Sequence, residues 1–300
     1  MYRIGIIGTE NSHAGNISRI INLPNPETGK LKYPDTRITG IYGPDPDSVK
    51  KIMDEVGVDY IAKEPEEFFG KVEAMCIVCR KGSLHEKYAL PFIEKGIPVF
   101  IDKPFTSDVA EAESLIAAAK KSGARIYGGS ILRIKQDVAI LKNTVKCMIA
   151  KSEFISACLN GTADPSSEYD GFFFYSPHLT ETALEIFGKE VRSIAAFDKN
   201  GDRTAVWRYD NFQVTLNYTV AGRDPAILIY GSKGNIYRDF NNTDAGSYKD
   251  ITLSQEILIE NFLNMVHNGT MLYPYEDFVV PVKMISAINE SVRTGKEIFI

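Results

Sequence analysis

The chain has 300 residues, of which 44% are apolar and 24% are charged, and its formal net charge is −5. These values are typical of a soluble globular protein with two domains or one large one. No basic tract with interleaved aromatic residues occurs, so we expect no nucleic-acid binding, and no apolar run approaches the ~20 residues that span a bilayer. The first residues enter a strand without the layout of a signal peptide, so we expect a cytoplasmic protein.

The first ~125 residues alternate short apolar strands with amphipathic helices. Repeated β-α units of this length predict a parallel, doubly wound sheet of the Rossmann type with right-handed crossovers. We therefore expect one α/β domain at 1–125. The predicted strands are Arg3–Gly8, Arg37–Tyr42, Tyr60–Ala62, Ala74–Cys79, Ile97–Ile101 and Arg125–Tyr127, and the predicted helices are Ala14–Leu23, Pro46–Glu55, His85–Lys95 and Val109–Ser122.

Beyond residue 128 the pattern changes, beginning with a predicted helix at Ile131–Cys147. Segments that alternate with period two, joined by turns, then predict a C-terminal α+β domain at 126–300 with a mainly antiparallel open sheet. Such a sheet needs its second face covered, so we expect a homodimer or homotetramer formed through it, with the apolar positions of Phe212–Tyr218 as candidates. The predicted strands are Phe154–Leu159, Ile194–Asp198, Thr204–Tyr209, Phe212–Val220, Ala226–Tyr230 and Asn235–Phe240, and the further helices are Pro177–Phe187, Ser254–His267 and Pro274–Arg293.

The four cysteines give no disulfide framework. Cys76 and Cys79 form a C-x-x-C string, but the string lies inside a predicted strand, where residues three apart point to opposite faces. This geometry disfavours a shared metal ion or a redox disulfide. We expect buried thiols and no metal site.

The loop after the first strand is a candidate phosphate-binding loop. A dinucleotide fingerprint would read G-x-G-x-x-G here, and only the first glycine is present, because a glutamate and a histidine replace the other two. The order of strand, loop and helix still aims backbone N–H groups at a bound anion, although the residues before the helix are equally suited to capping it. The candidate cofactor ligands of this loop are Gly8, Thr9, Glu10, Asn11, Ser12 and His13.

The ends of the second and fourth strands supply further candidates. A ribose-binding acidic residue is expected at the end of the second strand, where Gly43 stands instead and Asp45 follows two residues later. Nothing at this position rejects a 2′-phosphate, so the choice between NAD and NADP stays open. Cys79 and Arg80 end the fourth strand and are candidate cofactor contacts, although Arg80 is also typical of a solvated loop charge.

The most informative segment is Ile97–Phe105, in which a buried strand runs into Asp102-Lys103-Pro104. A lysine placed just beyond the carboxyl end of a parallel strand sits where open α/β sheets bind their ligands. Burial can bring the pKa of a lysine down from about 10.4 into a range useful for proton transfer. The alternative is a surface lysine in an ordinary exit from a strand.

With these features in place, the chain resembles the Gfo/Idh/MocA oxidoreductase family over nearly its full length. Asp102-Lys103-Pro104 matches the family's Glu-Lys-Pro, and His85 matches a histidine that follows the fourth strand. The resemblance makes Asp102, Lys103 and His85 cofactor contacts. Its other parts are Tyr175–Glu181, which resembles the Asp-x-Gly-x-His-x-x-Asp helix start, Tyr230–Asn235, which resembles a Gly-Thr-Lys-Gly hairpin, and the tail Gly269–Lys296.

The resemblance also implies roles for individual residues. Lys103 would lie near the nicotinamide and the substrate hydroxyl, and His178 would be the proton-transfer residue. Phe174 stands where the family has its first aspartate, so Tyr175 is a possible substitute donor, and Glu181 stands for the last aspartate as a hydrogen-bond acceptor. The aromatic run of which Tyr175 is the last residue is either ordinary core packing or a wall for a ring-shaped substrate.

Oxidation of a secondary alcohol needs a hydride acceptor and a base for the hydroxyl proton. A histidine with a pKa of about 6.5 suits that exchange, and a lysine beside the oxygen stabilises the developing alkoxide. The resemblance thus implies an NAD- or NADP-dependent oxidoreductase that acts on a hydroxyl of a sugar, cyclitol or related small molecule. The alternatives are a glycosidase that retains its cofactor and a non-catalytic protein that senses dinucleotide or sugar. Both enzymatic interpretations need Lys103 and His178 to converge on one cleft.

Overall fold

The computed structural model describes residues 1–222, 225–240 and 247–300, with side chains described from residue 254 onward in the last range. The chain forms two compact units. The first unit comprises Met1–Thr106, Ala110–Gly129 and Gln255–Asp277, and the second comprises Ser107–Val109, Ser130–Ser254 and Phe278–Ile300. The division into domains at residue 125 stays a prediction.

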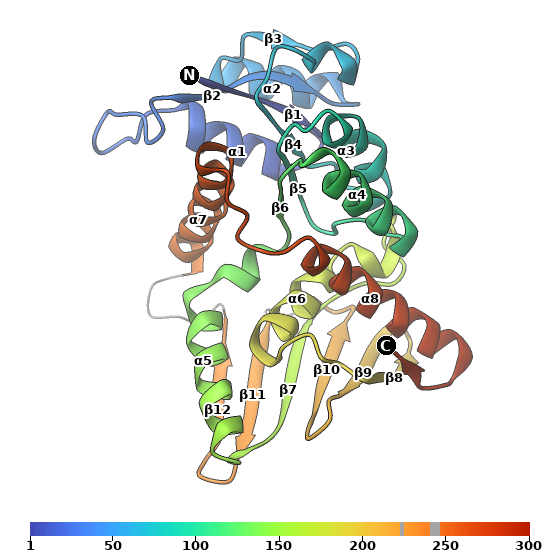
Figure 1. Ribbon diagram of the computed structural model, residues 1–300. Coiled ribbons are helices and arrows are strands. Elements are labelled where there is room, and N and C mark those ends of the chain that lie inside the picture. The colour runs from blue at the N-terminus through green and yellow to red at the C-terminus, as the bar shows by residue number, and fades with distance from the viewer. Residues whose placement is uncertain (223–224, 241–246) are drawn as a thin grey trace. The chain divides into compact units, whose positions relative to one another are not determined.

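The first unit is built on a six-stranded parallel sheet with the order β3-β2-β1-β4-β5-β6 (Figure 1). The central strands are fully buried and carry apolar side chains, as expected of a parallel sheet covered on both faces. The predicted Rossmann-like architecture is confirmed. The strands are β1 (Tyr2–Ile7), β2 (Thr36–Tyr42), β3 (Tyr60–Ile61), β4 (Ala74–Ile77), β5 (Val99–Ile101) and β6 (Ile126–Gly128).

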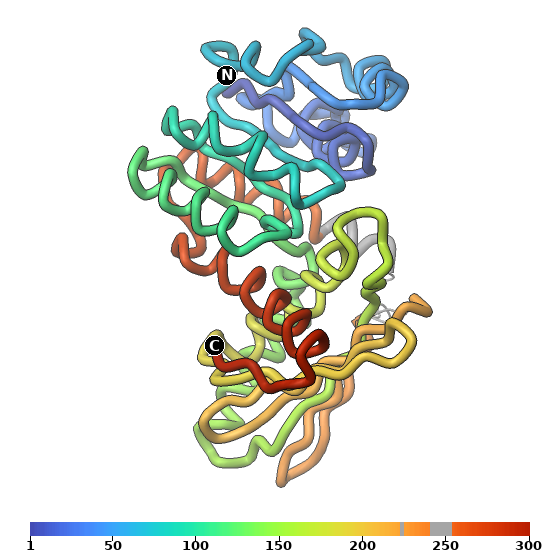
Figure 2. The backbone as a smooth tube through the Cα atoms, turned by 90° about the vertical axis from the view of Figure 1, so that its right-hand side faces the viewer, coloured from blue at the N-terminus to red at the C-terminus, as the bar shows by residue number. Residues whose placement is uncertain are grey.

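Helices cover both faces of this sheet. Figures 1 and 2 show α3 and α4 together on one face, with α1 on the other. A later helix, α7, also belongs to this unit from Gln255 onward and packs its Phe262 ring 5.7 Å from that of Phe100 on β5. The helices are α1 (Ser12–Asn22), α2 (Pro46–Val56), α3 (His85–Glu94), α4 (Val109–Ser122) and α7 (Ser247–Asn268).

The second unit is built on a seven-stranded sheet with the order β12-β11-β7-β10-β9-β8-β13. Every neighbouring pair is antiparallel except β7 and β10, which run parallel. The predicted, mainly antiparallel sheet is confirmed, and β13 adds a short strand that the sequence pattern did not predict. The strands are β7 (Phe154–Thr162), β8 (Ser193–Lys199), β9 (Asp202–Arg208), β10 (Gln213–Thr219), β11 (Ala226–Gly231), β12 (Ile236–Asp239) and β13 (Ile298–Phe299).

Helices α5 (Gln136–Ala150) and α6 (Ser176–Phe187) pack on β7 and on each other, and α8 spans Glu276–Thr294. The apolar residues of β10 lie in the core of their own unit, because Val214, Leu216 and Tyr218 are fully buried. They are therefore already covered within one chain, and the homo-oligomer stays a prediction that would need other residues of the sheet.

The four cysteines are free thiols, and Cys76 and Cys79 are buried as predicted. Burial raises the pKa of both thiols well above its usual range. No described helix is both long enough and apolar enough to cross a bilayer.

Candidate functional site

Residues from three neighbouring strands meet at one edge of the first unit. The strands β1, β4 and β5 are parallel and adjacent, so their carboxyl ends lie side by side at the sheet edge where open α/β sheets bind ligands. We call residues 8–13, 79–80 and 102–103 the ligand edge. The amide of Asn11 donates to the carbonyl of Val78 at 2.5 Å, which fastens the loop after β1 to the end of β4.

Gly8 is required by its backbone and by its surroundings. Its φ is +104°, and a Cβ at this position would lie 2.4 Å from the backbone nitrogen of Cys79. Asn11 caps α1, because its side-chain oxygen accepts from the backbone N–H of His13 at 2.8 Å. This leaves Ser12 as the first residue of the helix and confirms that the loop leads directly into a helix N-terminus.

The carboxylate of Glu10 is engaged by the turn after β4. Its Oε1 accepts from the backbone N–H of Arg80 at 2.9 Å, and the Arg80 guanidinium donates to the carbonyl of Glu10 at 2.6 Å. Glu10 and Arg80 therefore hold each other. One oxygen of the carboxylate that stands in place of the second glycine is thus held by a backbone N–H of the ligand edge, whereas its Oε2 is buried without a hydrogen-bond partner in the described part of the chain.

The structure gives Gly43 and Asp45 local roles at the end of β2. A Cβ on Gly43 would lie 1.9 Å from the hydroxyl oxygen of Thr9, so the close approach of Thr9 requires glycine. The Thr9 hydroxyl also bonds that of Ser48 at 2.9 Å. Asp45 caps α2 by accepting from the backbone N–H of Asp47 at 3.1 Å, and its contact with a ribose stays a prediction.

Asp102 joins Lys103 to His13. Asp102 and Lys103 are buried, with 4% and 8% of their surface exposed. One carboxylate oxygen of Asp102 accepts from the backbone N–H of Lys103 at 2.8 Å, and the other bonds Nδ1 of His13. These three residues form what we call the edge triad, and His13 is its most exposed member, with 36% of its side chain exposed.

The edge triad perturbs its own ionisation. Burial pushes the pKa of Asp102 upward, but the charge and hydrogen bond of His13, followed by those of Lys103, bring it down to about 2. The charge of Asp102 in turn raises the pKa of His13 above 6.5, against burial and the nearby charges of Lys103 and Arg80. The pairing of Asp102 with His13 therefore favours the charged form of each group.

His85 lies behind this edge and is fully buried. Its Nδ1 is 2.7 Å from the carbonyl oxygen of Pro104, and its Nε2 is 2.9 Å from that of Cys79. The imidazole thus joins the turn after β4 to the turn that follows Lys103. This bridge is a structural role, and contact with a cofactor stays a prediction.

A second polar cluster surrounds His178 in the second unit. Nδ1 of His178 bonds the hydroxyl of Ser130 at 2.7 Å, and the backbone N–H of Ser130 donates to Glu181 Oε2 at 2.8 Å. Arg133 adds a contact to the same carboxylate at 3.5 Å. We call these residues the Ser130 cluster. No motif pointed to Ser130 or Arg133, and the only sequence signal was the Gly128-Gly129 pair that ends β6.

The aromatic run before α6 divides into two parts. Phe172 and Phe173 are buried, and the Phe172 ring packs against Tyr218. Phe174 and Tyr175 contact each other, and the half-exposed Tyr175 ring lies 5.8 Å from that of His178. The run therefore supplies both core packing and an aromatic flank to His178.

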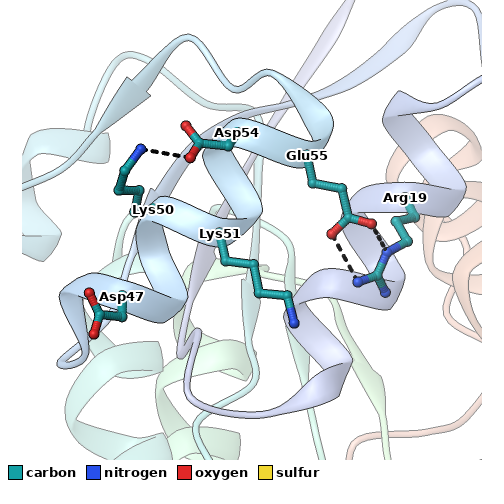
Figure 3. Close-up of a pocket in the computed structure, with 6 residues that line it drawn as sticks. All are labelled: Arg19, Asp47, Lys50, Lys51, Asp54 and Glu55. Carbon is teal, nitrogen blue, oxygen red and sulfur yellow. Dashed lines mark hydrogen bonds and ion pairs between the residues drawn. The ribbon is translucent and has the colours of Figure 1, made fainter.

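An open hollow on α1 and α2 carries no such chemistry (Figure 3). Its lining is charged and paired within itself, with Lys50 bonded to Asp54 at 2.6 Å and Arg19 to Glu55 at 2.5 Å. Small-molecule pockets are mostly apolar with a few polar groups, so we assign no ligand to this hollow. The described residues also include no group of three or more His, Cys, Asp or Glu side chains that could hold a metal ion.

Known proteins resemble this chain in sequence and in fold. Myo-inositol 2-dehydrogenase of Thermotoga maritima is 24% identical over 64% of this chain and 65% of its own length. Myo-inositol 2-dehydrogenase of Lactobacillus plantarum has a TM-score of 0.83 at 16% identity, covering 100% of this chain and 99% of that one. Scyllo-inositol dehydrogenase of Lactobacillus casei, solved with NAD(H) and scyllo-inositol, has a TM-score of 0.82 at 15% identity, covering 100% and 99%.

The match to the curated relatives is partial, because it spans between about half and two thirds of the length of the first ones. The structural likeness, at these low identities, concerns the fold. The family model GFO_IDH_MocA, described as an oxidoreductase family with an NAD-binding Rossmann fold, matches residues 2–130, which contain the strands of the first unit and the whole edge triad. The match to this family model is thus confined to an N-terminal segment of the chain, which forms less than half of its length.

Proposed function

We propose that this protein is an NAD-dependent oxidoreductase that oxidises a hydroxyl-bearing carbon of a cyclitol or related polyol. The observation that carries the proposal is the buried Lys103, paired through Asp102 with His13 at the carboxyl edge of the NAD-binding fold. The names of the relatives, several of which are inositol dehydrogenases, support the substrate class.

The residues of the ligand edge fit a dinucleotide. Gly8 keeps the backbone of the loop free of a side chain, and the backbone N–H groups at the start of α1 favour a bound diphosphate. Glu10 does not oppose it freely, because its carboxylate is engaged by Arg80. We infer that residues 8–12 hold the diphosphate. When bound, NAD supplies the acceptor for the hydride of the alcohol carbon.

The side chains of the protein act on the hydroxyl. Lys103 carries a positive charge in a largely water-excluded position, where it stabilises negative charge that develops on the substrate oxygen. The hydroxyl proton goes to a histidine, and the family resemblance assigns this role to His178 with Tyr175 beside it. Lys103 and His178 belong to different units, so their convergence on one substrate is part of the proposal.

Cofactor binding tests the first part of the proposal. Isothermal titration with NADH and NADPH, supported by the fluorescence of the reduced nicotinamide, should detect binding of NADH. We expect Lys103→Ala to lower kcat for polyol oxidation by roughly 10²–10³-fold, while the Kd for NADH changes less than about threefold. Lys121→Ala, on the exposed face of α4, is the matched control and should have no effect.

A substrate panel tests the second part. Myo-inositol, scyllo-inositol and open-chain polyols are compared with aryl glycosides while NADH formation and aglycone release are both followed. The proposal predicts NADH formation with a polyol. Aglycone release without net NADH would indicate a glycosidase, and no binding of NADH or NADPH at millimolar concentration would overturn the enzymatic proposal.

A further inference from the structure

We propose that His13 is a catalytic residue whose Nε2 accepts the proton of the substrate hydroxyl, with Asp102 holding Nδ1 and Lys103 directly following Asp102 in the chain. This inference rests on the proposed function, because it requires an alcohol substrate. It differs from the family resemblance, which gives the proton-transfer role to His178.

The partly exposed imidazole of His13 is paired with the buried carboxylate of Asp102. Asp102 has 6% of its side chain exposed and His13 has 36%, so a ligand can reach the histidine and not the aspartate. A carboxylate on Nδ1 favours the tautomer that carries its proton on Nδ1, which leaves the lone pair on Nε2. Asp102 is the only hydrogen-bond partner of the His13 ring among the residues that the structure describes.

The backbone of Lys103 holds Asp102 in place. Its other oxygen accepts from the backbone N–H of Lys103 at 2.8 Å. A single buried carboxylate thus connects the helix start that carries His13 with the turn that carries Lys103. A base held by a third, immobile group is the arrangement by which enzymes position a proton acceptor.

The hydrogen bonding of His178 differs from that of His13. The partner of its Nδ1 is the hydroxyl of Ser130, which itself accepts from the backbone N–H of Leu132 at 3.1 Å. This leaves the Ser130 hydrogen free to point at Nδ1, a geometry that favours the proton of a neutral imidazole on Nε2. In that tautomer Nε2 of His178 already carries a hydrogen, so it lacks the lone pair that a proton acceptor needs.

The proposed step removes one proton and one hydride from the alcohol. The hydroxyl proton moves to Nε2 of His13, the hydrogen on the alcohol carbon leaves as hydride to NAD, and the C–O bond becomes a carbonyl. The substrate loses two electrons and the cofactor gains them. His13, then an imidazolium paired with Asp102, returns its proton to solvent.

The charges facing His13 set the pH dependence. Asp102 raises its pKa, while burial, Lys103 and Arg80 lower it, and the balance is a pKa above 6.5. The neutral base becomes more abundant as pH rises through that value. Alcohol oxidation should therefore become faster as pH rises through the pKa of His13, and Asp102→Asn should move this limb to lower pH.

Nuclear magnetic resonance tests the tautomer and the pKa without cofactor or substrate. The chain has 4 histidines, so long-range ¹H–¹⁵N spectra can be assigned with single variants. We expect His13 to show the Nδ1–H tautomer at high pH and a pKa above 6.5 that falls in Asp102→Asn. An Nε2–H tautomer, or a pKa that Asp102→Asn leaves unchanged, would overturn the proposal.

Kinetics test the assignment to chemistry. We expect His13→Gln to lower kcat by about 10²–10⁴-fold and to abolish the rise of the oxidation rate with pH. The Kd for NADH should stay within about threefold of wild type. The control is His267, whose ring packs on Tyr2. The variant His267→Gln should keep the wild-type rate.

The outcomes separate the two proposals. Wild-type turnover in His13→Gln would remove His13 from the mechanism and leave the proposed function standing. Absence of NADH binding and turnover in the wild-type protein would instead remove the proposed function. If His13→Gln does not fold, the tautomer and pKa measured on the wild-type protein still decide the case.

Discussion

The two polar clusters are built around a histidine in opposite ways. The edge triad of the first unit holds His13 with a buried carboxylate, which Lys103 directly follows in the chain. The Ser130 cluster holds His178 with a neutral hydroxyl, and the ring of Tyr175, which contacts Phe174, lies against His178. The difference teaches that the proposed proton acceptor, His13, has a charged partner on its ring, whereas His178 has a neutral one.

The largest stability effect should come from the His85 bridge beneath the edge triad. Replacing this fully buried imidazole in His85→Leu removes both ring contacts to the carbonyls of Cys79 and Pro104, one of which loses its N–H donor. We expect a loss of about 3 kcal/mol in the free energy of unfolding, measured by urea denaturation. His267→Leu, at a half-buried position of the same unit, should lose less than about 1 kcal/mol, and equal losses would show that the bridge is dispensable.

The charge of Asp102 should give the next largest effect, and its sign depends on pH. The folded pKa of Asp102 is about 2, against 3.8 for the ordinary group, so its contribution is fully present above pH 4 and is lost as pH falls toward 2. Asp102→Asn should therefore cost about 2 kcal/mol at pH 5 and almost nothing near pH 2. A difference between wild type and variant that is independent of pH would contradict the ion pair.

The Ser130 cluster should respond more weakly to loss of charge. Glu181→Gln keeps an acceptor for the backbone of Ser130 but removes the charge that faces the buried Arg133. We expect a loss of about 1 kcal/mol in the free energy of unfolding. Glu290→Gln is the matched control, because its partner Arg293 is exposed, and it should cost under about 0.5 kcal/mol. A Glu181→Gln cost equal to that of the control would place both pairs in the same class.

The smallest effect is expected at the charged hollow of Figure 3. Lys50 and Asp54 form an exposed i,i+4 pair on α2, far in the sequence from the edge triad. Lys50→Ala should change the Kd for NADH by less than about twofold and stability by under about 0.5 kcal/mol. A tenfold loss of NADH affinity in this variant would move the cofactor site to the hollow and break the comparison.

The β-α repeat of the first unit and the alternating strands of the second were predictable, because both patterns are local in the sequence. What covers the apolar face of each strand was not predictable. The apolar residues of β10 are buried in the core of their own unit. Lys103 was found from its place after a strand. His13 was predicted as a cofactor ligand, but its pairing with Asp102 was not, because 89 residues separate the two and only the strand order brings them together.

Two residues that the dinucleotide fingerprint indicated as ligands make local hydrogen bonds within the protein. Asp45 follows β2 closely enough to suggest a ribose contact, yet it begins α2 as its N-cap. Glu10 replaces a glycine of the fingerprint and was a candidate cofactor ligand, yet its carboxylate accepts from the backbone N–H of Arg80. In both cases a nearby backbone N–H decides the position of the carboxylate, and such a donor leaves no mark in a single sequence.

The return of the chain into the first unit has a consequence for how the protein is made. Phe262 packs on Phe100, and the amide of Asn261 donates to the hydroxyl of Tyr127 at 3.0 Å, so α7 completes a core begun more than a hundred residues earlier. A ribosome that has released only the first 129 residues has released a sheet whose covering helix is still to be translated. The first unit therefore reaches its final packing only after most of the second unit has emerged.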